Sequence, residues 1–488
     1  MSKKSFKDIV EPFLKGLPEV KQPLWHIHFK RKLAETLGIL VLYFILANVP
    51  LFGLSSESID IFKLNRAFYG GSAGCLLFLG ASPIIFAWFI LQVLVGSGII
   101  KLDMSDPRDQ ALYQGAEKLL IFILIVVETL YLVLGGFIIP DQRLAITLGV
   151  DISMISLVLF IQIAFGGVLI YFMDEVVSKR GIGRGVNLII LAGISQQLVH
   201  GLFNWELDPN GWAIGIIPRW IQIFTRMNLY EIFWEGINFL FEHYAIALIA
   251  TIIIFFVAIY LECTRIEIPL AHATARGARG RFPIKLNYAG SAPTILVLSL
   301  ITSIQMIGMI IYYKGIAIFG TFSGLHAISG MMYYLSPIEG FHQWIPSLVH
   351  KSTVLGHIQT WQIALHVGTY IFMWVIGSTI FTLLWINTTG RSKGVASQIH
   401  SSGLQIPGHR RTAATIERMM EGYITKVAIM GSLFTVGLIL LASFFGTIGD
   451  VGGAALVVAI YITYRLYEDV ASEQLMEMFP AMRRFFRE

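Results

Sequence analysis

Long apolar stretches recur along this chain and are separated by shorter polar segments. An α-helix needs roughly 17–25 mostly apolar residues to cross the hydrocarbon core of a bilayer. Ten stretches predict such helices, at about 34–51, 82–99, 119–138, 153–173, 186–203, 245–262, 291–313, 366–387, 424–446 and 451–467. The segment 214–241 is also apolar, but Arg219, Arg226, Glu231 and Glu235 interrupt it, so we interpret it as an interfacial helix within a loop.

Two of the predicted helices begin alike. Gly80-Ala-Ser-Pro83 opens the second, and Gly290-Ser-Ala-Pro293 opens the seventh. Gly and Pro leave backbone groups without helical partners, which hydrocarbon does not tolerate unless protein or water covers them. Matched interruptions in two halves of a membrane protein indicate where its cargo passes. Chance is the alternative explanation, because these four residue types are common in membrane helices.

The two matched helices lie five helices apart, which is an odd number, so they run through the bilayer in opposite directions. The pattern therefore predicts an all-α polytopic membrane protein, with ten transmembrane helices as two inverted five-helix halves around a central pore. Its predicted parts are an N-terminal segment (1–33), a first half (34–203), an external loop (204–244), a second half (245–467) and a C-terminal tail (468–488).

The composition supports a membrane protein. Of the 488 residues, 55% are hydrophobic and 14% are charged, whereas globular domains carry about 25% charged residues. Cytosolic loops are enriched in Lys and Arg. With the N-terminus inside, only seven of the 36 Lys and Arg residues fall outside: Lys63, Arg66, Arg143, Arg219, Arg226, Lys314 and Lys351. Both termini are therefore predicted to face the cytosol.

The sequence has no recognisable nucleotide-binding, zinc-protease or serine-hydrolase motif. Glu128 is the main ionisable residue deep inside a predicted span, and a charge there costs at least about 2.5–3.5 kcal/mol. We therefore expect no catalytic residue, metal or cofactor, and a partner that drives any transport. A secondary transporter would need more such groups, and a membrane enzyme would need a cluster of them. Four histidines that are close in sequence, His342, His350, His357 and His366, are irregularly spaced, and the first three lie in a predicted external loop.

Two predicted cytosolic loops carry basic turns. In the loop 264–289, alternating apolar residues flank a glycine- and arginine-rich tip, which predicts a hairpin. Its arginines are Arg276, Arg279 and Arg281. The loop 388–423 contains a second tip with Arg410 and Arg411. Such loops favour docking of phosphate-rich RNA or an acidic protein. The alternative is that they only determine the orientation of the chain.

Several motifs, in order, resemble the SecY family of Sec protein-conducting channels, on its archaeal and eukaryotic branch. The resemblance runs from about Pro18 to Glu468. Its most specific pieces are Leu94-Val-Gly-Ser-Gly-Ile-Ile100, Ile161-Gln-Ile-Ala-Phe-Gly166, Asp174-Glu-Val-Val-Ser-Lys-Arg-Gly-Ile-Gly183, Arg265-Ile-Glu-Ile-Pro-Leu-Ala-His272, Tyr333-Tyr-Leu335 and Tyr464-Arg-Leu-Tyr-Glu468.

The resemblance implies a clamshell around an hourglass pore, with a lateral gate between the second and seventh spans. It places the apolar pore ring at Ala81, Ile85, Val186, Ile190, Ile295 and Val458. The spacing i, i+4 puts the members of each pair on one helical face. Ala81 departs from the bulky aliphatic residue usual in the family. Leu456 is the alternative to Val458, because a short insertion at 447–453 makes that alignment insecure.

The resemblance also implies a plug, a short amphipathic helix under the ring in the resting channel. We call residues 55–73 the plug segment, with its apolar positions at Ile59, Ile61, Phe62, Leu64 and Phe68. An external interfacial helix is the alternative interpretation of this segment. The family's polar gate cluster corresponds to Gln92, Glu128, Ser303 and Gln305, although Ser303 stands where asparagine is common and Phe86 where a small hydroxyl residue occurs.

The implied function is passage of unfolded secretory polypeptides, and sideways release of membrane segments, through the pore-forming subunit of a Sec channel in the plasma membrane. The implied partners are a SecE-like gamma subunit, a small beta subunit, signal sequences, nascent polypeptides and the lipid bilayer. The basic tips match family loops that dock the ribosome, and signal-recognition machinery is the alternative partner expected there. In bacteria the same loops bind a motor ATPase, and the sequence leaves the driving partner open.

Overall fold

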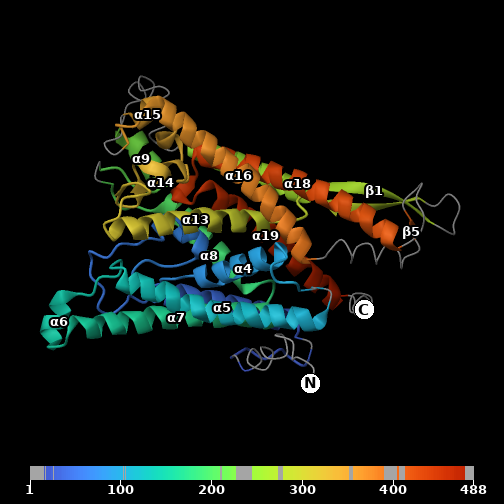
Figure 1. Ribbon diagram of the computed structural model, residues 1–488, viewed down its shortest axis with the longest axis horizontal. Helices are drawn as coiled ribbons and strands as arrows, with labels where there is room; N and C mark the ends of the chain where they lie inside the picture. Colours follow the sequence, from blue (N-terminus) through green and yellow to red (C-terminus); the bar gives the residue numbers. More distant parts are fainter. Residues whose placement is uncertain are drawn as a thin grey trace.

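The computed structural model describes residues 16, 18–25, 27–102, 104, 106–208, 211–226, 245–272, 279–350, 355–389, 404–405 and 413–478. Helices dominate this part of the chain (Figure 1). Each predicted span overlaps one long helix, although the first and third spans were predicted to end about five residues too late. The helices are α2 (Phe29–Leu46), α4 (Ser82–Gly96), α5 (Pro107–Leu134), α7 (Ile152–Arg180), α8 (Gly185–Phe203), α12 (Ala245–Cys263), α13 (Ala292–Tyr313), α16 (Thr360–Thr389), α18 (Ala413–Phe445) and α19 (Gly453–Met478).

Six of these helices are long and apolar enough to cross a membrane on length and composition alone, namely α7, α8, α12, α13, α16 and α18. Helix α4 is apolar but shorter, with 15 residues. Helices α2, α5 and α19 extend past their apolar parts into charged turns, which dilutes their apolar character. The predicted spans of these three helices are their apolar parts.

The Gly-Pro repeat of the sequence is also a repeat of local geometry. Gly80 and Gly290 have φ angles of 60° and 63°, in the left-handed region that favours glycine. Each donates its N–H to the carbonyl three residues earlier, and each is followed by a helix with proline in its first turn. Because proline needs no N–H partner there, both helices begin abruptly.

The two halves lie side by side in Figure 1, with α4, α5 and α7 below and α13, α16 and α18 above. Within the first half, α5 packs on α4 and α7, and α2 packs on α7 and α8. Within the second half, α16 packs on α13 and α18, and α12 packs on α18 and α19. The halves meet where α4 contacts α16 and α13, and again where α8 contacts α19.

A small sheet extends from one end of the bundle, which we call the hairpin end (Figure 1). Strands β1 (Arg265–His272) and β2 (Arg279–Lys285) pair antiparallel, from Arg265 opposite Lys285 to Ala271 opposite Arg279. This confirms the predicted hairpin. Strand β5 (Leu404–Gln405) joins the other edge of β1. The start of α2 lies at the same end, because Lys32 forms a 2.6 Å ion pair with Glu473 of α19.

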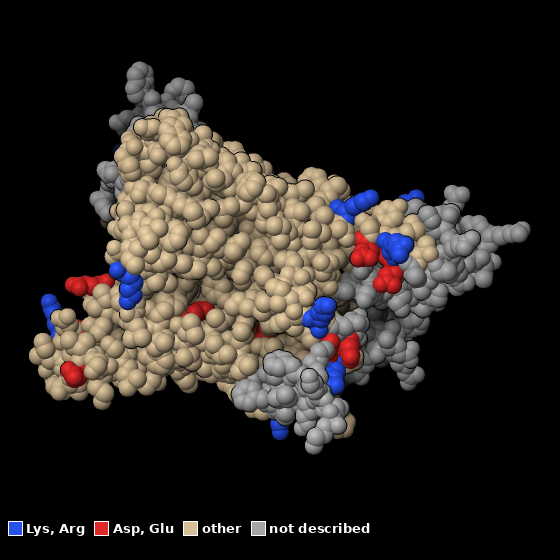
Figure 2. Space-filling view, viewed as in Figure 1, with Lys and Arg blue, Asp and Glu red and all other residues tan. Residues whose placement is uncertain are grey.

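Short elements cover the opposite end of the bundle. They include α6 (Gln142–Leu148), α9 (Ile216–Arg226), α14 (Gly330–Tyr334), α15 (Pro346–Val349), η2 (Phe341–Gln343), η3 (Ile448–Asp450), and the strand pair β3 (Phe322–Ser323) and β4 (His326–Ala327). Helix α9 forms the early part of the predicted interfacial helix at 214–241, whose residues 227–241 lie outside the described part. Figure 2 shows Lys, Arg, Asp and Glu mainly toward the two ends of one face; the broad band between them is mostly uncharged, apart from small acidic patches in its lower part.

Candidate functional site

The plug segment is less helical than the sequence predicts. A helix was expected over residues 59–68, but the structure has only η1 (Lys63–Asn65) and α3 (Arg66–Tyr69) there. Residues 59–60 are irregular and 61–62 form a turn instead, because the Asp60 carboxylate accepts hydrogen bonds from the N–H of Phe62 and the Nε of Arg66. Side chains that bond nearby backbone in this way compete with helix formation.

The predicted apolar positions of the plug segment face the protein interior. Ile61, Phe62 and Phe68 are buried, and Ile59 is partly buried against the same core. The backbone of Leu64 lies in η1, and its side chain is outside the described part. An external interfacial helix would instead turn these residues toward a membrane surface. The burial therefore favours a segment that packs inside the bundle.

The plug segment fits closely against α8 and the start of α4. A Cβ atom on Gly193 of α8 would lie 2.6 Å from the carbonyl oxygen of Ala67, so only glycine permits this approach. The hydroxyl of Tyr43 donates to the carbonyl of Gly70 at 2.6 Å. The N–H of Ala81 donates to the carbonyl of Tyr69 at 2.7 Å. The segment is thus held by α2, α4 and α8 together.

The predicted ring residues belong to the main apolar core or pack against it; this core draws on all ten long helices and also contains Phe62 and Phe68. Ala81, Ile85, Ile190, Ile295 and Val458 are at most 6% exposed, and Val186 is partly buried against this core. They come from α8, α13, α19 and the start of α4, at the junction of the two halves. Leu456 is 3% exposed and in the same core, so burial does not separate it from Val458.

The predicted gate residues do not form one hydrogen-bonded cluster. Gln92 donates to the Thr388 hydroxyl of α16 at 2.8 Å, and Glu128 accepts from the Ser82 hydroxyl at 2.6 Å. Ser303 donates to the carbonyl of Ser299 in its own helix, and Gln305 donates to the carbonyl of Met332. The sequence did not identify Ser82 or Thr388, although Ser82 lies one turn before Phe86 on the same face of α4.

A second polar group was not predicted. The hydroxyl of Tyr69 in the plug segment lies beside Thr302 of α13, and near Glu128 and Tyr131 of α5. One oxygen of each side chain is buried without a hydrogen-bond partner among the described residues. Buried unpaired polar groups are costly. Three different elements of the fold therefore bring polar side chains together where the plug segment meets the gate helix.

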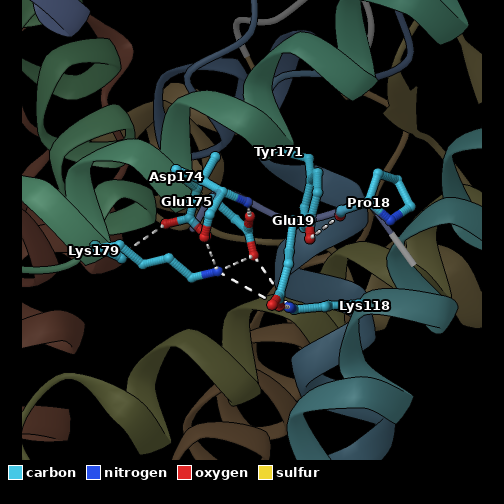
Figure 3. Close-up of polar contacts among 9 residues, drawn as sticks. Pro18, Glu19, Lys118, Tyr171, Asp174, Glu175 and Lys179 are labelled. Atoms are coloured by element: carbon cyan, nitrogen blue, oxygen red, sulfur yellow. Dashed lines mark hydrogen bonds and ion pairs between the residues drawn. The ribbon is translucent and has the colours of Figure 1, made fainter. Parts of the chain in front are cut away.

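The segment before α2 is clipped onto α5 and α7 at the hairpin end (Figure 3). Glu175 accepts the N–H of Val20 at 2.6 Å, and Lys179 donates to the carbonyl of Val20 at 2.6 Å. Glu19 pairs with Lys118 and, at 3.6 Å, with Lys179. Both the backbone N–H and the carbonyl of Val20 are thus held by side chains one turn apart on α7.

Acid is expected to loosen this clip. The hydrogen bond from Lys118 lowers the pKa of Glu19 below its ordinary value of 4.5. The contact is therefore fully present above about pH 4.5 and is lost as the pH falls through the lowered pKa. A spin label at residue 22 should become mobile over that range. With Lys118→Met it should already be mobile at neutral pH. A label that stays immobile down to pH 3 in both proteins would contradict the prediction.

The two basic loops are brought together by the sheet. Because Ala271 pairs with Gln405, the end of β1 lies against the segment that leads to Arg410 and Arg411. Arg281 forms an exposed 2.6 Å ion pair with Glu267 across the hairpin, and Arg279 lies opposite Ala271. Arg276, Arg410 and Arg411 are outside the described residues. The pairing supports one shared surface rather than two separate tips.

The described part of the chain contains no group of three or more His, Cys, Asp or Glu residues arranged to hold a metal ion. Cys75 and Cys263 are not joined to each other. Glu128 has Ser82 as its hydrogen-bond partner rather than a second charged group.

Comparison with known proteins agrees with this geometry. Residues 75–467 match SecY, and residues 41–74 match the plug domain of Sec61p. The protein translocase subunit SecY of Archaeoglobus fulgidus is 48% identical over 98% of both chains, and that of Haloferax volcanii is 42% identical over 99% of both. A solved protein-conducting channel matches with a TM-score of 0.78 and 34% identity, over 96% of this chain and 98% of its own. Sec61 in the canine ribosome-channel complex matches with a TM-score of 0.74 and 34% identity, over the same shares.

The fold and its apolar waist define a multi-pass helical membrane protein of the protein-conducting channel class, with ten spans in two inverted halves. The chain belongs to the SecY family of protein translocase subunits. The predicted fold class and resemblance are thereby confirmed, as is the presence of a plug, whose family match begins earlier in the chain than the predicted residue 55. The individual ring, gate and docking residues stay predictions.

Proposed function

We propose that this chain forms the pore of a translocase that passes unfolded polypeptides across the membrane and releases membrane segments sideways. The observation that supports the proposal is that the predicted ring positions and the plug segment are buried or partly buried in one apolar core, to which both halves contribute. Apolar side chains at a constriction exclude water and ions without a charged filter. They also yield around an extended chain, because no fixed bonds hold them.

The lateral gate in this proposal lies where α4 of the first half meets α13 and α16 of the second. The Gln92–Thr388 hydrogen bond and the packing of Phe89 against Phe381, with ring centroids 5.8 Å apart, join α4 to α16. Interhelical hydrogen bonds in membranes contribute about 0.6 kcal/mol each. Packing therefore closes the gate, and an apolar signal sequence replaces that packing with contacts of the same kind.

Site-specific photocrosslinking to a stalled, translocating nascent chain tests this function. A photoreactive residue at Ile190 or Ile295 should crosslink to the nascent chain in the channel. The matched control positions are Val199 on α8 and Ile307 on α13, which are each 56% exposed and should reach lipid instead. The proposal fails if the ring positions give no crosslink, or give no more than the control positions.

The docking partner in this proposal is the ribosome, bound at the hairpin end by the surface that β1, β2 and β5 organise. This surface faces the cytosol in the proposed orientation, together with both termini. We place the protein in the plasma membrane, with a SecE-like gamma subunit and a small beta subunit. Large apolar side chains exposed along α2, α7 and α12 offer lipid or single-span subunits a surface to cover.

Charge reversal at Arg410 is expected to weaken ribosome binding about tenfold, or about 1.4 kcal/mol. The loss comes from a broken phosphate contact and the repulsion of a new carboxylate, so it should shrink as salt screens both. Cosedimentation at several salt concentrations measures it. Lys314→Glu, an exposed residue at the opposite end of the bundle, is the control. Equal binding by Arg410→Glu and the unmodified protein at low salt would refute this role.

A further inference from the structure

Helix α4 crosses α16 very closely near the last turns of both helices. Gly96 is the last residue of α4, and Leu384 and Thr388 lie in the final two turns of α16. A Cβ atom on Gly96 would lie 2.9 Å from the carbonyl oxygen of Leu384, 3.0 Å from its Cβ and 3.0 Å from Oγ1 of Thr388. The two atoms of Leu384 are fixed by the backbone and cannot rotate away. Glycine at position 96 therefore sets how closely the two helices approach.

The hydroxyl of Thr388 closes the same crossing with two hydrogen bonds. It accepts one from Nε2 of Gln92 at 2.8 Å and donates one to the carbonyl of Leu384 at 2.8 Å. Gln92 is 2% exposed and lies one turn before Gly96 on α4. A buried amide that loses its acceptor raises the free energy of the closed state. Bulk at position 96 that separates the helices would therefore also break this hydrogen bond.

The crossing lies at the hairpin end of the proposed lateral gate. Helix α16 leads from Thr389 toward β5 of the sheet, and Figure 1 shows its last turns beside the end of α4. Two turns before Gly96, the rings of Phe89 and Phe381 continue the same contact between the helices. In the proposed orientation this end faces the cytosol. A signal sequence that enters the gate from the cytosol therefore meets this crossing first.

We propose that Gly96 and Thr388 determine signal specificity, because their contact sets how apolar a signal sequence must be to part α4 from α16. This inference rests on the proposed lateral gate and assigns part of its selectivity to two residues. An entering signal must replace the packing of the crossing, and the Gln92–Thr388 hydrogen bond, with contacts of its own. A looser crossing lowers that requirement, so less apolar signals should be accepted.

A series of signal sequences with increasing numbers of leucine in the apolar core tests the proposal. Translocation is measured with the full-length chain and its co-purifying small subunits in proteoliposomes. Gly96→Ala and, more strongly, Gly96→Leu should move half-maximal translocation toward fewer leucines, by about two for Gly96→Leu. Gly368→Leu is the matched control, because Gly368 is an exposed glycine of α16 with nothing within 4 Å of its Cβ position. It should keep the dependence of the unmodified chain.

Variants of Thr388 test the polar half of the contact. Thr388→Val keeps the shape of the side chain and removes the hydroxyl, so it should also move the dependence toward fewer leucines. Thr388→Ser keeps the hydroxyl and should retain the unmodified dependence. A role in packing alone would not distinguish serine from valine in this direction. Both changes are small, so they remain informative if Gly96→Leu does not fold.

Spin labels at Ser97 and Leu383 measure the separation of the two helices without any transport, because both positions are exposed. Gly96→Leu should lengthen the distance between the labels in the resting channel, and Gly368→Leu should not. An unchanged distance in Gly96→Leu would overturn the inference. An unchanged leucine dependence in both Gly96→Leu and Thr388→Val would overturn it as well.

The crosslinking experiment separates this inference from the proposed function. If nascent chains crosslink to Ile190 and Ile295 in every variant while the leucine dependence stays the same, the proposed function stands and the role of Gly96 and Thr388 is rejected. If these ring positions give no crosslink in the unmodified chain, the proposed function itself is rejected.

Discussion

Replacing Gly80 with alanine is expected to release the plug segment and let ions leak through the resting channel. Gly80 has a φ of 60°, and a Cβ atom there would lie 2.3 Å from the carbonyl oxygen of Tyr69 and 2.6 Å from the nitrogen of Gly71. The left-handed conformation costs an alanine about 1–2 kcal/mol. The clash adds to this cost, because both neighbours are backbone atoms that cannot rotate away. We expect the packed state of the plug segment to lose about 3 kcal/mol or more of stability.

Ion conductance of proteoliposomes without substrate measures this effect, and the leak should rise many-fold. Gly98→Ala is a matched control, because Gly98 also has a positive φ, of 77°, but nothing lies within 4 Å of its Cβ position. That variant carries the conformational cost without the clash and is far from the plug segment. If the Gly80→Ala channel conducts no more ions than the Gly98→Ala control, the packing of the plug segment does not depend on this turn.

The second large effect is expected for Arg66→Met, which removes the central polar contact of the plug segment. The Arg66 guanidinium bonds the Asp60 carboxylate, donates to the carbonyl of Phe78 at 2.6 Å and lies 4.6 Å from the centre of the Phe78 ring. Methionine keeps the apolar length, leaves Asp60 without its charged partner and removes this donor from the carbonyl of Phe78. Removing one partner of such a pair costs about 2–4 kcal/mol, so the plug segment should unfold locally and the resting leak should rise.

A double-mutant cycle with Asp60→Asn isolates the pair. The two substitutions together should cost clearly less than the sum of their separate costs, since each removes the same interaction. Lys63→Met is the control, because Lys63 is an exposed cation in the same segment. Additive effects in the cycle, or a leak from Lys63→Met as large as that from Arg66→Met, would show that net charge rather than this contact holds the segment.

The helices could be predicted because each depends on local composition. Every apolar stretch of about 20 residues corresponds to one helix. The starts of α4 and α13 also share the same turn, in which glycine has a positive φ and proline follows in the first turn of the helix. The hairpin was predictable for the same reason, since alternation and a glycine-rich tip are local signals. The plug helix was predicted too long, because the side chain of Asp60 bonds its own neighbourhood and replaces the first helical turn.

The polar partners at the gate could not be predicted, because they depend on which helices become neighbours. Gln92 was assigned to the boundary between the second and seventh spans, yet its partner Thr388 lies 296 residues away on α16. Ser82 supplies Glu128 with the hydroxyl expected at position 86, one turn away on α4. Tyr69 and Thr302 carry no sequence signal, since single hydroxyl groups in apolar segments are common and only the fold brings them together.

The pairing of β5 with β1 has a mechanical consequence. Strand β1 connects directly to α12, β2 leads into α13, and β5 lies in the connection between α16 and α18. A load applied to this sheet is therefore divided among four long helices of one half. No strand of this sheet connects directly to a helix of the first half. A large partner bound to the sheet would therefore hold the second half in place and leave the first half free to move relative to it.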